Sequence, residues 1–234
     1  PYNEVSSILR TDDGNIWLSM FCGGVFKVEN LDTDFRTDAL ENIRKSLRTN
    51  SVRSIFPMPD GRLWLGIIGF GMVLYDPFDG SFLSYEKYPA FRDFPYTSSV
   101  DVISRRRSTS EICFGTYSQG LWLLDPSSRS GARRVISEEY PDFSHLGVTA
   151  IAEDNASNLW IGTRKGVFVM TPGNKVFSIA DYLPDAALDP LSDVIVTDLK
   201  SARDGSVWIA TNYNGVYRLF PSDGSLVRWS LGES

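Results

Sequence analysis

One sequence unit recurs five times along the 234 residues of this chain. Its clearest part is an apolar or aromatic triplet that follows a polar turn. The triplets are Ile16-Trp17-Leu18, Leu63-Trp64-Leu65, Ile112-Cys113-Phe114, Leu159-Trp160-Ile161 and Val207-Trp208-Ile209. Their central residues, at 17, 64, 113, 160 and 208, are 47, 49, 47 and 48 positions apart. A period of about 20 to 50 residues is typical of one supersecondary unit copied in tandem, so this repeat limits which folds the chain can adopt.

Each unit is expected to contain four strands. An alternating segment, the usual strand signal, opens each repeat, and the triplet forms the second strand. A glycine six or seven positions after the triplet centre opens the third strand, and a short fourth strand follows. The opening segments begin at Val5, Val52, Val100, Val148 and Val196, and the glycines are Gly24, Gly71, Gly120, Gly166 and Gly215. Only the stretch from Asp38 to Leu47 has a pattern that could compete as a helix.

The turns between first and second strands differ among the repeats. Asp13-Gly14, Asp60-Gly61 and Asp204-Gly205 predict two-residue hairpin turns, because Asp-Gly readily adopts the positive φ angles that such turns need. Ser110-Glu111 and Ser157-Asn158 stand there in the third and fourth repeats, which predicts wider turns.

Four antiparallel strands copied radially make the blade of a β-propeller, whereas solenoid repeats are usually shorter and carry fewer strands. We therefore expect an all-β fold, a β-propeller of five four-stranded antiparallel blades forming one region over residues 1–234. The expected blades are approximately 1–47, 48–95, 96–143, 144–191 and 192–234.

Composition adds bounds on function. The net charge of −6 argues against a nucleic acid or an anionic lipid surface as partner. No run of about 18 apolar residues predicts a membrane span. The chain starts abruptly at Pro1 with no signal-peptide pattern, which we interpret as an excised piece whose export signal lies elsewhere. Its two cysteines, Cys22 and Cys113, are expected to be free thiols.

The repeat resembles a known family. Val148–Val167 (VTAIAEDNASNLWIGTRKGV) and Val52–Gly66 (VRSIFPMPDGRLWLG) are similar to the two-component regulator propeller repeat. That resemblance implies the extracytoplasmic, periplasmic sensor region of a Bacteroidetes-type hybrid histidine kinase, whose phosphorelay lies outside this chain. It also implies a wheel of seven blades, of which this chain supplies five. Two departures from the pattern are Cys113 in place of a tryptophan and Asp154 without a glycine partner.

The long, variable loops are expected on one rim, at 36–51, 86–99, 137–147 and 181–195, together with the hairpins between second and third strands. Function concentrates in such loops. Aromatic rings beside amide, guanidinium and carboxylate groups suit sugars, which need apolar faces and polar partners together. The alternative is that the rings only pin the loops to the blades. The candidate ligand-binding residues are Phe21, Phe70, Tyr88, Phe91, Arg92, Tyr117, Gln119, Tyr140, Arg164, Lys165, Asn212, Tyr213 and Asn214.

Other conspicuous residues predict structure rather than chemistry. The tryptophans of the second strands are expected to pack between blades. His145 is the single histidine and has no nucleophile motif beside it. The turn carboxylates Asp12, Asp13, Asp60, Asp154 and Asp204 are explained by turn formation. We expect no catalytic residue, no metal and no cofactor.

Three hypotheses of function remain. The first is a non-catalytic sensor region that binds an oligosaccharide or related signal on the loop rim and relays it to a histidine kinase outside this chain. The second is a scaffold without its own ligand, for dimerisation or protein contact. The third is a propeller lyase or hydrolase, which the single histidine makes the weakest. The expected partners are an oligosaccharide and a second copy of the full receptor, with membrane contact only through other parts of the parent protein.

Overall fold

The computed structural model describes residues 4–11, 14–21, 24–28, 51–95, 99–184 and 188–229. The chain divides into two compact units. The first is Pro1–Ile103 with Ser128–Ala132, and the second is Ser104–Ser127 with Arg133–Ser234. The segment predicted as a competing helix, Asp38–Leu47, and Cys22 both lie outside the described residues.

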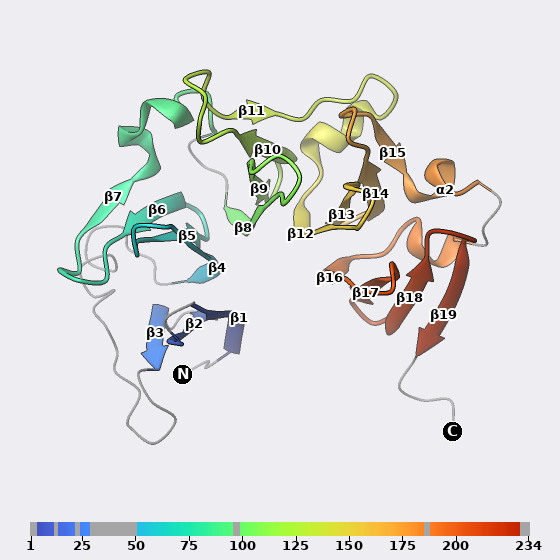
Figure 1. Cartoon of the computed structure of the whole chain (residues 1–234), viewed down its shortest axis with the longest axis horizontal. Helices are drawn as coiled ribbons and strands as arrows, with labels where there is room; N and C mark the ends of the chain where they lie inside the picture. The colour runs from blue at the N-terminus through green and yellow to red at the C-terminus, as the bar shows by residue number, and fades with distance from the viewer. Residues whose placement is uncertain are drawn as a thin grey trace. The chain divides into compact units, whose positions relative to one another are not determined.

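The first unit contains two antiparallel sheets, drawn from blue to green in Figure 1. One sheet has the order β1-β2-β3, with strands at Glu4–Arg10, Ile16–Phe21 and Gly24–Val28. The other has the order β4-β5-β6-β7, with strands at Val52–Pro57, Leu63–Ile67, Gly71–Tyr75 and Phe82–Ser84. The 3-10 helices η1 (Tyr85–Lys87) and η2 (Pro89–Phe91) follow β7.

The second unit contains the sheets β12-β13-β14-β15 and β16-β17-β18-β19. Their strands are Val148–Glu153, Leu159–Thr163, Gly166–Met170 and Val176–Ser178, then Val196–Ser201, Val207–Thr211, Val216–Phe220 and Ser225–Trp229. A further sheet has the order β8-β9-β10-β11, at Val100–Arg105, Ile112–Thr116, Leu121–Leu124 and Arg133–Arg134, and the division between the units falls within β8. The short helices are η3 (Pro141–His145), α2 (Ile179–Tyr182) and η4 (Asp189–Leu191).

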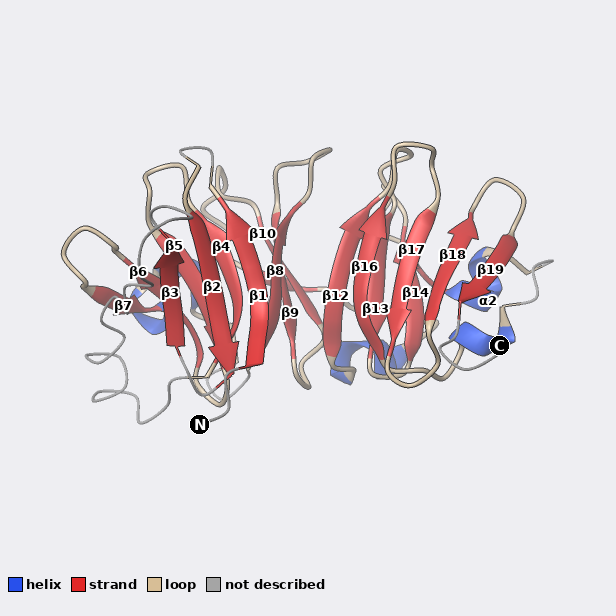
Figure 2. Ribbon diagram, turned by 90° about the horizontal axis from the view of Figure 1, so that it is seen from below, coloured by secondary structure: helices blue, strands red, loops and turns tan. Residues whose placement is uncertain are grey.

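Every sheet is ordered as its strands follow in the chain, with antiparallel neighbours, as a propeller blade requires. The prediction of an all-β, five-bladed propeller region is therefore confirmed. Four blades have four strands, and the first has three among the residues that the structure describes. In each blade the turns after the first and third strands share one end, here called the turn side. The second-to-third hairpin and the connection to the next blade share the other end, called the loop side. Figure 2 shows η3 at the loop side of β12, opposite the β12–β13 turn.

The first-to-second strand turns correct the sequence prediction. They are three-residue loops, as in Met58-Pro59-Asp60-Gly61-Arg62, where Gly61 N donates to Met58 O and Met58 N donates to Arg62 O. Gly61 takes a φ of 87°, which is the left-handed residue that ends a type I turn in a three-residue hairpin. The fourth blade has a turn of the same length, because Ser157 adopts this conformation with a φ of 66°. Only the third blade has a turn one residue longer, closed by Ser110.

The second-strand tryptophans pack as predicted in three blades. Trp17 and Trp64 are each 4% exposed and Trp160 is fully buried. Trp160 lies in a cluster formed by the last two blades, with Val196 and Ile209 among its members. Blades are also joined by hydrogen bonds, because Thr149 Oγ1 donates to Val196 O over 2.6 Å.

Two tryptophan positions differ from this pattern. Trp208 is only half-buried and stacks on Trp229, with ring centroids 5.2 Å apart. In the third blade Cys113 is buried, and desolvation raises the pKa of its thiol to about 12, so it is protonated at neutral pH. Arg106, 1% exposed and paired with Glu111 at 3.0 Å, lies close enough for its charge to act on Cys113. The third blade thus has a small buried thiol where the other blades have a tryptophan, and the Arg106–Glu111 ion pair lies near it.

Candidate functional site

Among the described residues, no group of three or more His, Cys, Asp or Glu side chains could hold a metal ion. His145 Nδ1 lies 3.3 Å from Nη2 of Arg134, on the exposed end of η3. Arg134 also donates to the backbone oxygens of Gln119 and Ser144, so these residues tie η3 to the neighbouring hairpin. No helix in the described parts of the chain is both long and apolar enough to cross a membrane.

A shallow hollow of about 460 Å³ lies in the connection after β7. Three of the predicted ligand-binding residues, Tyr88, Phe91 and Arg92, line it together with Glu86 and Lys87. These three residues, which were singled out from the sequence, therefore lie on one concave surface. The hollow is open, and its wall combines carboxylate, ammonium and guanidinium groups with aromatic rings.

The rings below this hollow are a small aromatic core. Phe91 is 2% exposed, and its centroid lies 5.4 Å from that of Trp64 and 5.7 Å from that of Phe94, with the rings edge to face. Tyr88 packs on Trp64 at 5.3 Å and is half-buried. These contacts are the favoured geometry for aromatic pairs. Phe91 therefore anchors the loop on the blade and presents no free face, whereas Arg92 is exposed.

The second unit holds an exposed aromatic–cation pair on its loop side. Tyr117, 51% exposed, is at the tip of the β9–β10 hairpin, and the guanidinium carbon of Arg164 lies 4.4 Å from its ring centroid. Arg164 belongs to the β13–β14 hairpin, so the pair joins two blades. Gly147 makes this approach feasible: a Cβ there would lie 2.5 Å from Tyr117 O and 2.7 Å from Arg164 Cδ.

Other predicted residues surround this pair or lie apart from it. The Gln119 carbonyl accepts from Trp122 Nε1 at 3.0 Å. Tyr140 donates a hydrogen bond to the carboxylate of Asp181. Burial and this hydrogen bond raise the pKa of Tyr140. Hydrogen bonds from Ser178 and Tyr140 lower the pKa of Asp181. The remaining predicted residues include the exposed Lys165, Asn212 and Tyr213, the half-buried Phe70 and Asn214, and Phe21, whose ring lies 5.9 Å from the guanidinium of Arg53.

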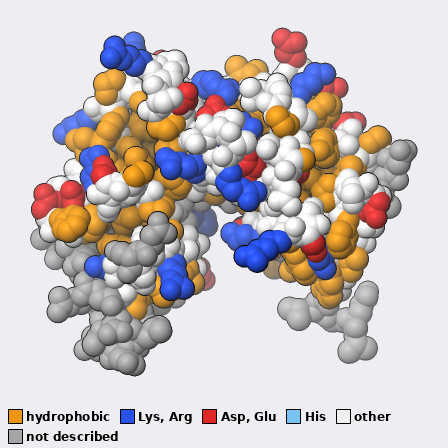
Figure 3. All heavy atoms as spheres, viewed as in Figure 1, with side chains coloured by type: hydrophobic (Ala, Val, Ile, Leu, Met, Phe, Trp, Pro, Cys, Tyr) orange, Lys and Arg blue, Asp and Glu red, His pale blue; other side chains and the backbone are white. Residues whose placement is uncertain are grey.

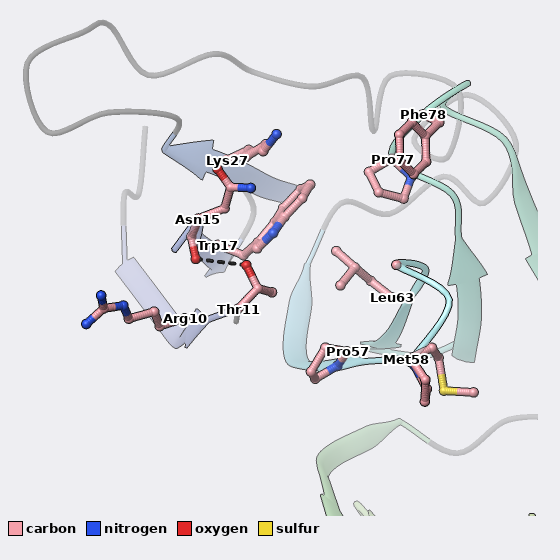
Figure 4. A pocket seen from close by; sticks show the side chains of 12 residues that line it. Arg10, Thr11, Asn15, Trp17, Lys27, Pro57, Met58, Leu63, Pro77 and Phe78 are labelled. Atoms are coloured by element: carbon pink, nitrogen blue, oxygen red, sulfur yellow. Dashed lines mark hydrogen bonds between the residues drawn. The ribbon is translucent and has the colours of Figure 1, made fainter. Parts of the chain in front are cut away.

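A second concave feature lies on the turn side, where no ligand was predicted. A cavity of about 400 Å³ opens between the β1–β3 and β4–β7 sheets (Figure 4). Trp17, Asn15 and Lys27 form one wall, and Leu63 and Pro77 face them across the space. The sequence signal for this cavity is the short Thr11 at the turn position where the fourth blade has Asp154.

Comparison with known proteins agrees with the propeller class defined by these sheets. Residues 142–165, which run from η3 to the β13–β14 hairpin, match the two component regulator propeller family. The expected repeat class is thereby confirmed. The matched segment ends with Arg164 and Lys165, in the β13–β14 hairpin. Comparison with curated proteins found no significant match.

Solved structures share the fold at low identity. The extracellular domain assigned to the hybrid two component system BT3049 from B. thetaiotaomicron is 19% identical, with a TM-score of 0.71, over 98% of this chain and 29% of that one. The extracellular domain assigned to the one component system BT4673 of the same organism is 15% identical, with a TM-score of 0.67, over 98% and 35%. A catalytically inactive virginiamycin B lyase from Staphylococcus aureus with quinupristin is 14% identical, with a TM-score of 0.66, over 97% and 70%. The chain spans about a third of the length of the two Bacteroides domains.

Proposed function

We propose that this chain is the ligand-sensing, non-catalytic part of an extracytoplasmic two-component sensor, binding an oligosaccharide on its loop side. A histidine kinase outside the chain would read the occupancy of that site. The repeat match at residues 142–165 and the likeness to extracellular domains of two-component systems support a sensor region. A seven-bladed parent, periplasmic placement and self-association through the full receptor belong to the same proposal.

The observation that carries the ligand assignment is the pair of Tyr117 and Arg164. A tyrosine ring that is half exposed and beside a guanidinium offers an apolar face and charged donors within one contact area. Sugars need both, because their C–H faces pack on rings while their hydroxyls require hydrogen-bond partners. Gln119 and Lys165, on the same two hairpins, supply further polar groups around the pair.

We expect Tyr117→Ala to weaken binding of the recognised oligosaccharide by about tenfold, which corresponds to about 1.4 kcal/mol. The measurement is a thermal-shift screen of plant, host and microbial oligosaccharides, followed by titration of the hit with both proteins. A ligand that binds only the folded state raises the unfolding midpoint in a dose-dependent way.

The matched control is Ile136→Ala, which removes another exposed apolar side chain of the second unit, 71% exposed. Its affinity should equal that of the unaltered chain. The loop-side assignment is wrong if Tyr117→Ala binds the hit as tightly as the control does.

A second candidate function, a scaffold for protein contact, has one observation in its favour. In the last blade one face is buried, with Val207, Ile209 and Leu219 at 0% exposure. The opposite face carries a cluster of large apolar side chains that remains partly exposed, and Figure 3 shows hydrophobic side chains at the surface beside β18 and β19. The exposed fractions are 37% for Val216, 43% for Val227 and 47% for Trp229.

The equivalent face of the fourth blade is covered by the fifth, as the burial of Trp160 and Val169 shows. We therefore propose that this face packs against another sheet of the same repeat, supplied by a second copy when this chain is alone. Light scattering across a concentration series should show self-association that Val227→Lys removes. A chain that stays monomeric at millimolar concentration would count against this use of the face.

A further inference from the structure

Tyr213, at the tip of the β17–β18 hairpin, has a backbone conformation that bulky residues rarely adopt. Its φ is 68°, in the left-handed region. Gly69 holds the same place in the β5–β6 hairpin, two residues before the glycine that follows each tip, and has a φ of 74°. The second blade thus meets this backbone requirement with a glycine. A tyrosine is unfavourable there, because its Cβ crowds the backbone, and strain of this kind clusters at functional sites.

The strained backbone presents the tyrosine ring to solvent. Tyr213 is 95% exposed, the highest value among the large hydrophobic side chains that the structure describes. Burial of the ring therefore does not offset the cost of the backbone conformation. The base of the hairpin is anchored, because Thr211 N and Thr211 Oγ1 both donate to Gly215 O, at 3.1 and 2.7 Å. Arg228 Nε also donates to Asn214 O at 3.0 Å. The hairpin thus holds the ring away from the blade on a fixed support.

The residues on either side of the ring indicate a neutral, hydroxyl-bearing ligand. Asn212 and Asn214 flank Tyr213, and neither side-chain amide makes a hydrogen bond within the described part of the chain. Each amide offers donors and an acceptor. A free ring between two such amides suits a sugar unit, whose C–H face packs on the ring while its hydroxyls bind the amides. The tip itself carries no charged residue, unlike the Arg164-Lys165 tip of the fourth blade.

Three hairpin tips of the second unit follow one another in a row on its loop side. Backbone hydrogen bonds join each hairpin to the connection beside it. They run from Gly120 N to Leu146 O, Arg164 N to Gly147 O, Gly166 N to Val194 O and Asn212 N to Ile195 O, at 3.1, 2.9, 2.7 and 2.8 Å. The row therefore leads from the tip with Tyr117 to the tip with Tyr213. Packed sheets lie about 10 Å apart, so two steps separate the outer tips by about 20 Å, which is further than a disaccharide reaches.

We propose that this row of hairpins binds one extended oligosaccharide, with a neutral sugar unit on Tyr213 and another unit on Tyr117. This inference rests on the proposed function and adds the length of the ligand and a second ring that selects it. The strained conformation of Tyr213 places its ring for the sugar, at a cost to the stability of the chain. Ligand length then decides affinity, because a short ligand reaches only one of the two rings.

The test is an NMR titration of the chain with isotopically labelled tyrosines, in which Tyr117→Phe and Tyr213→Phe assign the two ring signals. The probes are cellohexaose, xylohexaose, mannohexaose and maltohexaose, each with its matching disaccharide. We expect one of these hexasaccharides to shift both signals with a common dissociation constant. Its disaccharide should bind at least about tenfold more weakly, because it cannot engage both rings.

The outcomes separate this inference from the proposed function. A hexasaccharide that shifts the Tyr117 signal but not the Tyr213 signal overturns the extended site and leaves a loop-side oligosaccharide site at Tyr117. A shift of the Tyr213 signal alone, equal affinities of hexasaccharide and disaccharide, or no shift with any of the four hexasaccharides also overturns the extended site. The wider screen with Tyr117→Ala then decides the proposed function by itself.

Substitutions at Tyr213 separate the ring from the backbone. Tyr213→Asn removes the ring but keeps a residue that tolerates a positive φ, so it should weaken hexasaccharide binding about tenfold, whereas Tyr213→Phe should retain it. Phe78→Ala, which removes a ring that is 90% exposed in the first unit, should leave the affinity unchanged. Tyr213→Gly should unfold at an equal or higher midpoint, because glycine accepts this φ without strain. A lower midpoint would overturn the proposal, since the ring would then support the fold.

Discussion

Trp160→Ala is expected to lower the free energy of unfolding by about 3 to 5 kcal/mol, the usual cost of truncating a buried tryptophan. Trp160 has no exposed surface, and its ring lies edge-on to Tyr182 at 5.8 Å. The substitution also leaves the buried Asp154 carboxylate without its indole donor. The measurement is urea unfolding of both proteins followed by circular dichroism, with comparison of midpoints and slopes.

Phe78→Ala is the control for this loss, because it also removes a large aromatic side chain but one that is 90% exposed. Its unfolding free energy should stay within about 0.5 kcal/mol of the unaltered chain. Similar losses in the two variants would show that Trp160 does not hold the last two blades together in the way its burial implies.

Gly166→Ala is expected to cost about 2 to 5 kcal/mol, since two effects add at this residue. Gly166 opens the third strand of its blade with a φ of 83°, where any other L-residue is strained. A Cβ there would also lie 2.5 Å from the carbonyl oxygen of Ser192 and 2.8 Å from that of Leu191. The hairpin and the connection to the next blade would have to separate, and urea unfolding measures the cost.

Substitutions at two other glycines separate the cost of the positive φ from the cost of the close backbone contact. Gly205→Ala meets the same positive φ, 85°, but no atom within 4 Å, so it should cost only about 1 to 2 kcal/mol. Gly173→Ala meets neither problem, its closest neighbour being Thr171 Oγ1 at 3.9 Å, and should be nearly neutral. If Gly166→Ala and Gly205→Ala lose the same amount, the close approach of Ser192 contributes nothing to the cost.

Much of the fold could be predicted from the sequence because each blade repeats the same local pattern. The alternation from Val148 and the apolar triplet around Trp160 fixed strand type and order, since side chains alternate across a strand and one face must be buried. The glycines at the third strands were predictable for a similar local reason, namely their positive φ. The lengths of the turns were less predictable, because Asp-Gly fits both a two-residue and a three-residue loop. In the fourth blade, Ser157 also adopts a positive φ that its residue type disfavours.

The candidate sites depend on contacts between blades. Composition pointed to the loop that holds Tyr88, Phe91 and Arg92, and these residues do share a hollow. Only the packing shows that Phe91 is an anchor under Trp64, and only the approach of two hairpins over Gly147 brings Arg164 to Tyr117.

The sequence by itself determined the repeat, the strand order and the burial of most tryptophans, because these follow from periodicity within a single blade. The tertiary structure decided where a ligand can enter, because a cavity depends on which side chains fill the space between two blades. Thr11 and Asp154 occupy the same turn position, yet only the packed sheets show that one leaves about 400 Å³ beside an indole and the other fills it.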